Sequence, residues 1–236
     1  MAQSVGNAKN ILVGASPLFL SNVDINDSDY IANAEAGVAI AAGATTVGVP
    51  AFAPGASYAT TLNGVNQTAG LFGYRNVGFT NNGLQITYNP TYDSVTVDQL
   101  LDTAKLFKSA MEVMIATEMS EGTLENIVTV FGQSSSTLSA VTGTSTTTKQ
   151  ELGLAAGSLG AAPTERQLIA VGQAPTAGST SSERVYYARR VLSVQQSQHS
   201  LARTTATTFP VTFRLLPDAN YSGSEYGKII DRVLVV

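Results

Sequence analysis

The side chains that could do chemistry in this chain are few, and a lone histidine is the first of them. His199 is the only histidine among 236 residues, and cysteine is absent. A Ser-His-Asp mechanism would therefore have to use His199 as its base. Its surroundings read QQSQHSLARTT, a polar connector without the G-x-S-x-G turn that presents a serine nucleophile. We interpret His199 as a surface histidine; a zinc site would also lack thiolates and a second imidazole.

Three aspartates near the N-terminus have part of the spacing of a calcium-binding loop. Asp24, Asp27 and Asp29 offer carboxylate oxygens close together in the sequence. An EF-hand loop also needs a central glycine and a glutamate at its twelfth position. The glycine is missing, and Glu35 lies at best next to the required position. We interpret this segment as a solvated turn and predict no calcium site.

Glu118, Glu121 and Glu125 form a second carboxylate group, from which an acid/base pair could be drawn. Glu121 and Glu125 are one turn apart near the predicted start of a helix, where the helix dipole favours negative charge. Stabilisation of the helix end explains them without any reaction. Residues 143–149 (GTSTTTK) only partly match a phosphate-binding loop, because the glycine before the lysine is missing. We interpret that stretch as a flexible hairpin tip.

Arg184, Arg189 and Arg190 form the one basic cluster, in ERVYYARRV. They could pair with acids on a neighbouring subunit or bind an anion, and in a chain of this composition we favour the first. No catalytic, cofactor-binding or metal-binding residue is therefore predicted. We expect that the chain is not an enzyme.

The composition indicates a folded chain that associates with other subunits. Hydrophobic residues make up 44%, enough for a buried core, while charged residues make up 13%, about half the usual share. So weakly charged a surface suggests burial against other chains. The net charge of -4 argues against attraction to a phosphate backbone. We expect no signal peptide in residues 1–14 and no membrane span in residues 32–52, and the absence of cysteine fits a reducing cytosol.

Alternating apolar and polar residues predict a mainly β (α+β) single domain over residues 1–236. Strands are expected over residues 11–21, 84–97, 109–117, 166–171, 184–194, 204–216 and 228–236. The clearest strand places Phe209, Val211, Phe213 and Leu215 on one face, with Pro210 suited to a sheet edge or a bulge. An Asn82-Gly83 turn is expected before the strand at 84. A long arm or loop should occupy about 22–80, a Ser/Thr-rich loop about 133–160, and a C-terminal strand and tail about 204–236.

One short helix is expected over about residues 121–131. Its apolar face should hold Leu124, Ile127, Val128 and Phe131, at the i, i+3, i+4, i+7 spacing of a helix. Gly132 is well placed to end it in the left-handed conformation. Ser120 or Thr123 could cap its N-terminus.

Several motifs occur in the order found in a known family. Residues 78–84 (GFTNNGL), 97–99 (VDQ) and 118–127 (EMSEGTLENI) resemble the central block of the major tail tube protein of long-tailed, non-contractile (siphovirus-type) bacteriophages. Residues 11–21 are similar to the family's first strand, and residues 209–233 to its closing strand and tail. Each motif is short; their shared order over more than half of the chain makes the resemblance specific.

The resemblance implies an antiparallel β-sandwich or barrel flanked by one α-helix. Such subunits form hexameric rings that stack into the tail tube of the virion, after assembly in the cytoplasm of the host bacterium. The implied partners are further copies of the chain, the tape measure protein, the tail terminator and tail-tip or baseplate proteins. Phage DNA passes through the lumen during ejection without specific binding, and no membrane or cofactor is involved.

Physical arguments from the sequence agree with this expectation. Unpaired strand edges can pair with another chain, and a ring closes such edges. The segment at 22–72 and the Ser/Thr-rich hairpin are the expected contacts to the next ring. The alternatives are another ring-forming phage component, such as a tail terminator, baseplate or capsid decoration protein, or a carbohydrate-binding β-sandwich or glycosidase. The last is disfavoured because tryptophan is absent.

Overall fold

The computed structural model describes most of the chain from residue 74 onward and a short piece near the N-terminus. The described residues are 16–21, 74–100, 102–134, 137–142, 148–156, 158–160, 162–174, 182–195, 198–199, 201, 203–204 and 206–233. They form β1 (Leu18–Ser21), β2 (Tyr74–Asn76), β3 (Thr80–Thr96), β4 (Thr103–Met119), α2 (Leu124–Val130), β5 (Leu138–Thr142), β6 (Thr148–Leu152), β7 (Arg166–Gln173), β8 (Ser182–Ser193), β9 (Phe209–Leu215) and β10 (Gly227–Val233).

Eight of these strands form one antiparallel sheet. Its order is β2-β1-β7-β8-β9-β4-β3, and β10 pairs with β8 off this path, while β5 and β6 form a separate hairpin. β7 lies along one edge of β8. The other edge is shared, because residues 182–188 pair with β10 and residues 191–193 pair with β9. The predicted mainly β, antiparallel fold with a single helix is confirmed for the part of the chain that the structure describes.

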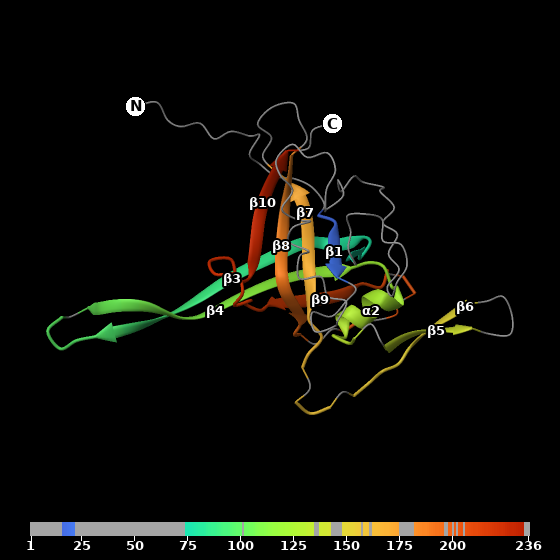
Figure 1. Ribbon diagram of the computed structural model, residues 1–236, viewed down its shortest axis with the longest axis horizontal. Helices are drawn as coiled ribbons and strands as arrows, with labels where there is room; N and C mark the ends of the chain where they lie inside the picture. The colour runs from blue at the N-terminus through green and yellow to red at the C-terminus, as the bar shows by residue number, and fades with distance from the viewer. Residues whose placement is uncertain are drawn as a thin grey trace.

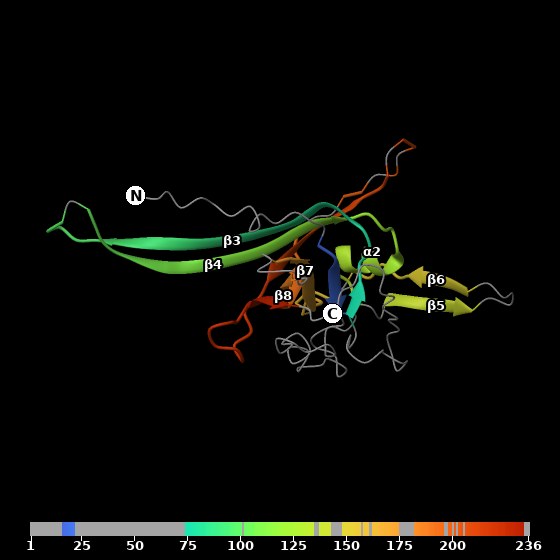
Figure 2. The same ribbon diagram turned by 90° about the horizontal axis from the view of Figure 1, so that it is seen from above.

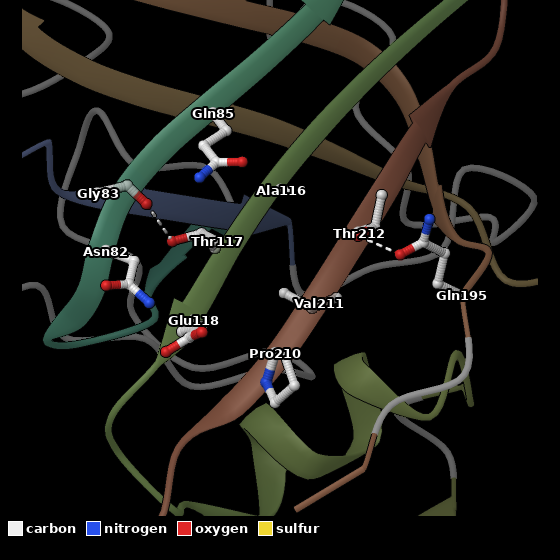
Figure 3. Close-up of a pocket in the computed structure, with 10 residues that line it drawn as sticks. All are labelled: Asn82, Gly83, Gln85, Ala116, Thr117, Glu118, Gln195, Pro210, Val211 and Thr212. Carbon is white, nitrogen blue, oxygen red and sulfur yellow. Dashed lines mark hydrogen bonds between the residues drawn. The ribbon is translucent and has the colours of Figure 1, made fainter.

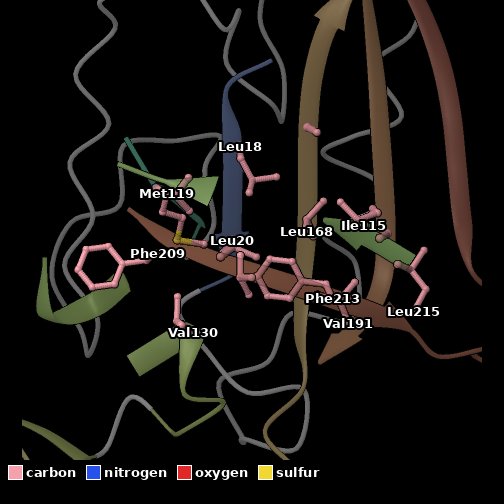
Figure 4. Packing of buried hydrophobic residues seen from close by; sticks show 14 of the residues in the cluster. Leu18, Leu20, Ile115, Met119, Val130, Leu168, Val191, Phe209, Phe213 and Leu215 are labelled. Atoms are coloured by element: carbon pink, nitrogen blue, oxygen red, sulfur yellow. The ribbon is translucent and has the colours of Figure 1, made fainter. Parts of the chain in front are cut away.

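The sheet folds over on itself where β8 changes partners. Figure 1 shows β1, β7, β8 and β10 crossing β3, β4 and β9 at a steep angle. Buried apolar side chains from both groups meet between them (Figure 4). Leu20 and Leu168 come from the first group and Phe213 from the second, and none is more than 1% exposed. The two parts of the sheet therefore enclose one core, as the sheets of a sandwich do.

Strand β9 confirms the clearest alternation in the sequence. All four predicted inward residues, Phe209, Val211, Phe213 and Leu215, are buried. Pro210 lies where β9 pairs only with β4, since the pairing to β8 begins at Phe213. A proline cannot donate a backbone hydrogen bond, so a position at a sheet edge suits it, as predicted.

The helix is shorter than predicted, and its buried face differs. Thr123 is its N-cap, accepting from the Asn126 backbone N–H at 3.3 Å, and Gly132 follows it with φ 65°, as expected for the left-handed stop. The predicted apolar face is wrong at Phe131, which is the C-cap and is 41% exposed. A seven-residue helix has no i+7 position for Phe131 to fill. The buried helix residues are Asn126, Val128, Thr129 and Val130.

The predicted turn at Asn82-Gly83 is also wrong, since both residues lie inside β3. They have φ values of 59° and 68°, and the register to β4 shifts between Asn81 and Gln85. Two left-handed residues here produce a bulge in a continuing strand rather than a reversal of the chain. The Thr117 hydroxyl donates to the Gly83 carbonyl at 2.9 Å and holds the bulge against β4.

Glu121 joins the segment before the helix to the loop before β3. Its carboxylate accepts a hydrogen bond from the Phe79 backbone N–H at 3.0 Å, and the Ser120 N–H donates to the Phe79 carbonyl at 2.8 Å. Asn126 adds hydrogen bonds of 2.9 Å to the carbonyls of Val77 and Glu121. Glu121 therefore precedes the helix and fastens a neighbouring loop, a contact that the helix-dipole interpretation did not anticipate.

We expect Gly78→Ala to destabilise the fold more than Gly83→Ala. Both glycines are left-handed, with φ of 85° and 68°, so alanine costs about 1–2 kcal/mol at either site. At Gly78 the new methyl group would also collide with the Glu121 carboxylate and displace it from Phe79, whereas no atom lies near the methyl position at Gly83. Urea unfolding of both variants measures the difference. Equal losses would mean that Glu121 moves aside at no cost.

The long arm or loop predicted at about 22–80 is wrong at its C-terminal end, because Tyr74–Asn76 form strand β2. Ser21, the last residue of β1, pairs directly with Tyr74, the first residue of β2. The part of this segment over residues 22–73 lies outside the described residues. Within the predicted Ser/Thr-rich loop at about 133–160, β5 and β6 form a hairpin.

Candidate assembly surface

A two-stranded ribbon projects from the sheet and is its most exposed part. β3 and β4 are each 17 residues long and pair along most of their length. β9 pairs with β4 only over residues 114–119. Beyond this point β3 and β4 continue together away from the other strands, as Figures 1 and 2 show from two directions. We call residues 88–108 the arm.

The arm carries large apolar side chains that the described part of the chain leaves exposed. The exposed ones are Tyr88, Tyr92, Val95, Val97, Leu100, Leu106 and Phe107. Their exposed fractions run from 38% to 65%. Isolated two-stranded hairpins are marginally stable in water, and exposed apolar surface on this scale usually marks an interaction site. The arm therefore has the character of a surface that another chain covers.

One face of the arm continues the pattern of the core. Directly opposed residues share a face of the ribbon, and Tyr88 lies opposite Val113. On this face Val113 and Ile115 are buried in the core. Farther along the arm, Tyr88, Tyr92 and Leu106 lie on the same face but are exposed. Coverage by the chain's own residues ends near Met111, whose carbonyl lies 3.5 Å from the Tyr226 hydroxyl. The apolar alternation thus extends beyond the chain's own core.

The charges of the arm are divided between its tip and its shaft. Asp98 and Asp102 flank Leu100 at the tip, and all three are exposed. The tip is a defined turn: the Leu100 N–H donates to the Val97 carbonyl at 3.1 Å, and the Thr103 N–H donates to Asp102 at 2.6 Å. Lys108 lies on the shaft with its Nζ 5.8 Å from the centre of the Tyr88 ring.

Besides the outer edges of β2 and β3 at the two ends of the sheet, the edges of β4 and β10 lack a second partner among the described strands over part or all of their length. The edge of β4 that β9 covers at 114–119 is uncovered over residues 103–113. β10 pairs with β8 on one side and with no described strand on the other. Unpaired edges are templates for pairing with another chain. Both edges are therefore available for assembly alongside the arm.

A second exposed apolar surface lies next to α2. His199 is packed there, with its ring centre 4.8 Å from that of Phe209 and 6.3 Å from that of Phe131. The Ser193 hydroxyl donates to the Val130 carbonyl at 3.0 Å, which brings the end of β8 to the end of the helix. Phe131, Val194 and Leu201 are 41%, 41% and 88% exposed. We call Phe131, Val194, His199 and Leu201 the helix-end surface.

A small polar pocket lies at the base of the arm between β3, β4 and β9 (Figure 3). Its volume is about 160 Å³, and its lining residues are Asn82, Gly83, Gln85, Ala116, Thr117, Glu118, Gln195, Pro210, Val211 and Thr212. The Thr117 hydroxyl donates to a backbone carbonyl and the Thr212 hydroxyl donates to Gln195 Oε1 at 2.8 Å. Neither hydroxyl is paired with a base that would activate it. Within the described ranges, no three His, Cys, Asp or Glu side chains gather as a metal site requires.

The basic cluster is satisfied within the chain. Arg184 donates two hydrogen bonds to Asp231, at 2.6 and 2.7 Å, and Arg190 donates two to Glu165, at 2.7 and 2.9 Å. The interpretation that these arginines pair with acids of a neighbouring subunit is therefore wrong for both. β8 lies between β7 and β10, so acids on β10 and just before β7 reach its side chains.

Arg189 has a structural position as well. It is 1% exposed, and its guanidinium carbon lies 3.6 Å from the centre of the Tyr221 ring. Its Nε donates to the Ser224 carbonyl at 3.0 Å. These contacts bind the turn before β10 to the middle of β8, so Arg189 stabilises the fold rather than an anion site.

We expect the Arg184–Asp231 pair to stabilise β10 in a pH-dependent way. Hydrogen bonds from Arg184 hold the pKa of Asp231 below its ordinary value. Stability from a carboxyl with a lowered pKa is present above its unfolded pKa and is lost as the pH falls through the folded value. Below about pH 4 the wild type should therefore lose its advantage over Asp231→Asn. Urea midpoints of both proteins at neutral and acid pH test this prediction. A difference between the two midpoints that stayed the same at acid pH would contradict it.

The remaining candidate residues are dispersed. Glu118 lies in β4 and lines the pocket, whereas Glu125 lies in the first turn of α2, as predicted. Lys149 lies in β6. The aspartates of the calcium-like segment, Glu35 and residues 143–147 lie outside the described residues. Among the described residues, the structure thus does not gather Glu118, Glu121 and Glu125 into one site.

Sequence reasoning missed the arm, although a signal for it was present. Strands were predicted at 84–97 and 109–117, but their pairing as one projecting ribbon was not. The signal is that apolar residues alternate along β3 well beyond the length that one core needs. No family model matches the chain, and no curated protein matches it. No helix in the described ranges is long and apolar enough to cross a membrane.

Proposed function

We propose that the chain is a structural subunit of a siphovirus-type phage tail tube. Copies assemble into hexameric rings, and the rings stack into a tube through which DNA is ejected. The ring number, the tube and the DNA conduit come from the resemblance of the motifs at 78–84, 97–99 and 118–127. The observation that carries the proposal is the arm, because it is an exposed apolar element with no covering partner among the described residues of its own chain.

The arrangement of surfaces supports repeated assembly. In Figure 1 the arm extends to one side of the sheet, and α2, beside which the helix-end surface lies, is on the other side. A contact between two different surfaces is heterologous, and such contacts produce rings or open filaments according to whether the rotation closes. The uncovered edges of β4 and β10 offer a second kind of contact, by strand pairing. A stacked-ring tube needs both kinds, one within rings and one between them.

The charge of the chain is compatible with a conduit. A lumen rich in lysine and arginine would bind DNA with a steep dependence on salt. The chain has a net charge of -4 and only 13 lysines and arginines in 236 residues. A neutral or slightly acidic wall would let DNA slide. A Lys/Arg-rich band on the lumen wall of assembled tubes would contradict this part of the proposal.

Within a virion the further partners would be the tape measure protein, the tail terminator and the tail-tip or baseplate proteins. Electron microscopy of the concentrated, purified chain tests the central claim. Long hollow tubes of uniform diameter are the expected result. Single rings that do not stack would favour a tail terminator, baseplate or capsid decoration protein instead. A chain that stays monomeric even when tail tips are added as seeds would overturn the proposal.

A further inference from the structure

We infer that the tip of the arm of one subunit binds the helix-end surface of a second copy. This inference rests on the proposed function, since it names a contact through which the subunits assemble. It concerns two exposed surfaces of the same chain that differ in charge and match in apolar character. Each surface is therefore covered by the other surface of a neighbouring copy.

The arm tip offers apolar groups in an acidic setting. Val97 and Leu100 are 38% and 57% exposed, with Asp98 and Asp102 beside them. Residues 94–104 contain these two acids and no lysine, arginine or histidine. The hydrogen bonds of the turn keep these groups in place before any partner arrives. The tip is thus a preformed turn in which exposed apolar side chains are flanked by acids.

The helix-end surface offers the complementary combination. Leu201 is 88% exposed and stands two residues after His199 and two before Arg203, which is exposed as well. Residues 194–208 contain Arg203 and His199 but no acid. The nearby helix has its acid, Glu125, in the first turn, away from Phe131 at its C-terminus. Opposite charge at the rim of an apolar contact favours the correct encounter and orientation.

The position of the two surfaces makes the partner a second copy. The arm points away from α2 in both views (Figures 1 and 2), so the tip faces away from the helix end of its own chain. Copies also supply tip and helix-end surface in equal numbers. Packing of His199 against Phe209 and the Ser193–Val130 hydrogen bond hold the helix-end surface together before docking. A head-to-tail contact of this kind uses one tip and one helix-end surface per subunit.

Charge reversal tests the contact. Asp98→Lys and Arg203→Glu alter exposed side chains, so each variant should unfold at the wild-type temperature. Each alone should raise the concentration needed for polymerisation about tenfold, because like charges then meet. The double variant Asp98→Lys/Arg203→Glu should return to within about threefold of the wild type. Asp102 is left unchanged because its carboxylate accepts a hydrogen bond from the Thr103 backbone N–H.

Asp93→Lys is the matched control, since it changes the net charge equally on the shaft of the arm. It should polymerise within about threefold of the wild type. Sedimentation and electron microscopy provide the readout. Single variants that polymerise normally, or a double variant no better than either single one, would overturn the inference. If the wild type itself does not polymerise, the proposed function fails. If the wild type polymerises but these variants do so equally well, only the inferred contact fails.

A mixing experiment adds a second readout. Leu100→Asp removes a working tip and Leu201→Asp removes a working helix-end surface. Each variant alone should fail to polymerise, while an equimolar mixture should form complexes of limited size, because each complex has one intact contact to use. Equal behaviour of the mixture and the separate variants would contradict a head-to-tail contact.

Discussion

Deletion of the outer arm will leave a folded chain that no longer builds tubes. Thr91 and Ala110 are direct cross-strand partners. Residues 92–109 between them can therefore be replaced by an Asn-Gly turn, which suits a two-residue hairpin. We expect the free energy of unfolding to stay within about 0.5 kcal/mol of the wild type, as for changes at the surface. Polymers should be absent at concentrations at which the wild type forms them.

The reason lies in where the core ends. Every described residue in the removed range is exposed, while the buried part of β4 begins at Val113 with Met111 packed partly against it. The deletion thus costs the monomer almost no buried apolar surface. It removes the apolar surface that we propose another copy covers.

Urea unfolding and electron microscopy check the two halves of this prediction separately. A deletion variant that forms normal tubes would show that the arm is not an assembly element. A variant that is unfolded would show instead that the arm stabilises the monomer. The second result would conflict with the exposure of both faces of the ribbon.

Phe213→Ala will cause the largest loss of monomer stability. Phe213 is 1% exposed, pairs with Ile115 of β4 and Ser193 of β8, and lies where the sheet folds over (Figure 4). Truncation of a buried phenylalanine costs about 3–5 kcal/mol, because transfer energy is lost and a cavity remains. That is a large fraction of the stability of an ordinary domain.

Phe79→Ala is the matched control for this variant. It removes the same atoms from a side chain that is 80% exposed, so the loss should be within about 0.5 kcal/mol. Urea unfolding of the two variants gives the comparison. Similar losses at Phe79 and Phe213 would mean that the fold described here does not place Phe213 in the core.

Local signals in the sequence predicted those elements whose cause is local. The alternation from Phe209 to Leu215 marks β9 and its buried face, because side chains of a strand point to opposite sides. The stop at Gly132 followed from the ease with which glycine adopts a left-handed backbone. Between the two possible caps, Ser120 and Thr123, the structure places Thr123 at the N-cap.

Features that depend on distant neighbours could not be predicted in the same way. Phe131 matched the helix pattern but lies past the helix end, where exposure depends on what packs nearby. Asn82-Gly83 has the composition of a turn, yet pairing with β4 resumes at Gln85, so the strand continues past the bulge. Arg184 and Arg190 form ion pairs with acids that are distant from them in the sequence.

The arm shows most clearly where the sequence stops being sufficient. By itself the sequence determined that β3 and β4 are amphipathic strands in a mainly β chain with few charges, because the alternation of residues is a local property. Only the tertiary structure decided that Tyr88 is exposed while Val113, which lies opposite it, is buried. β9 ends its pairing with β4 at Met114, and burial depends on which strands and side chains come to lie on a face, not on the residues of that face alone.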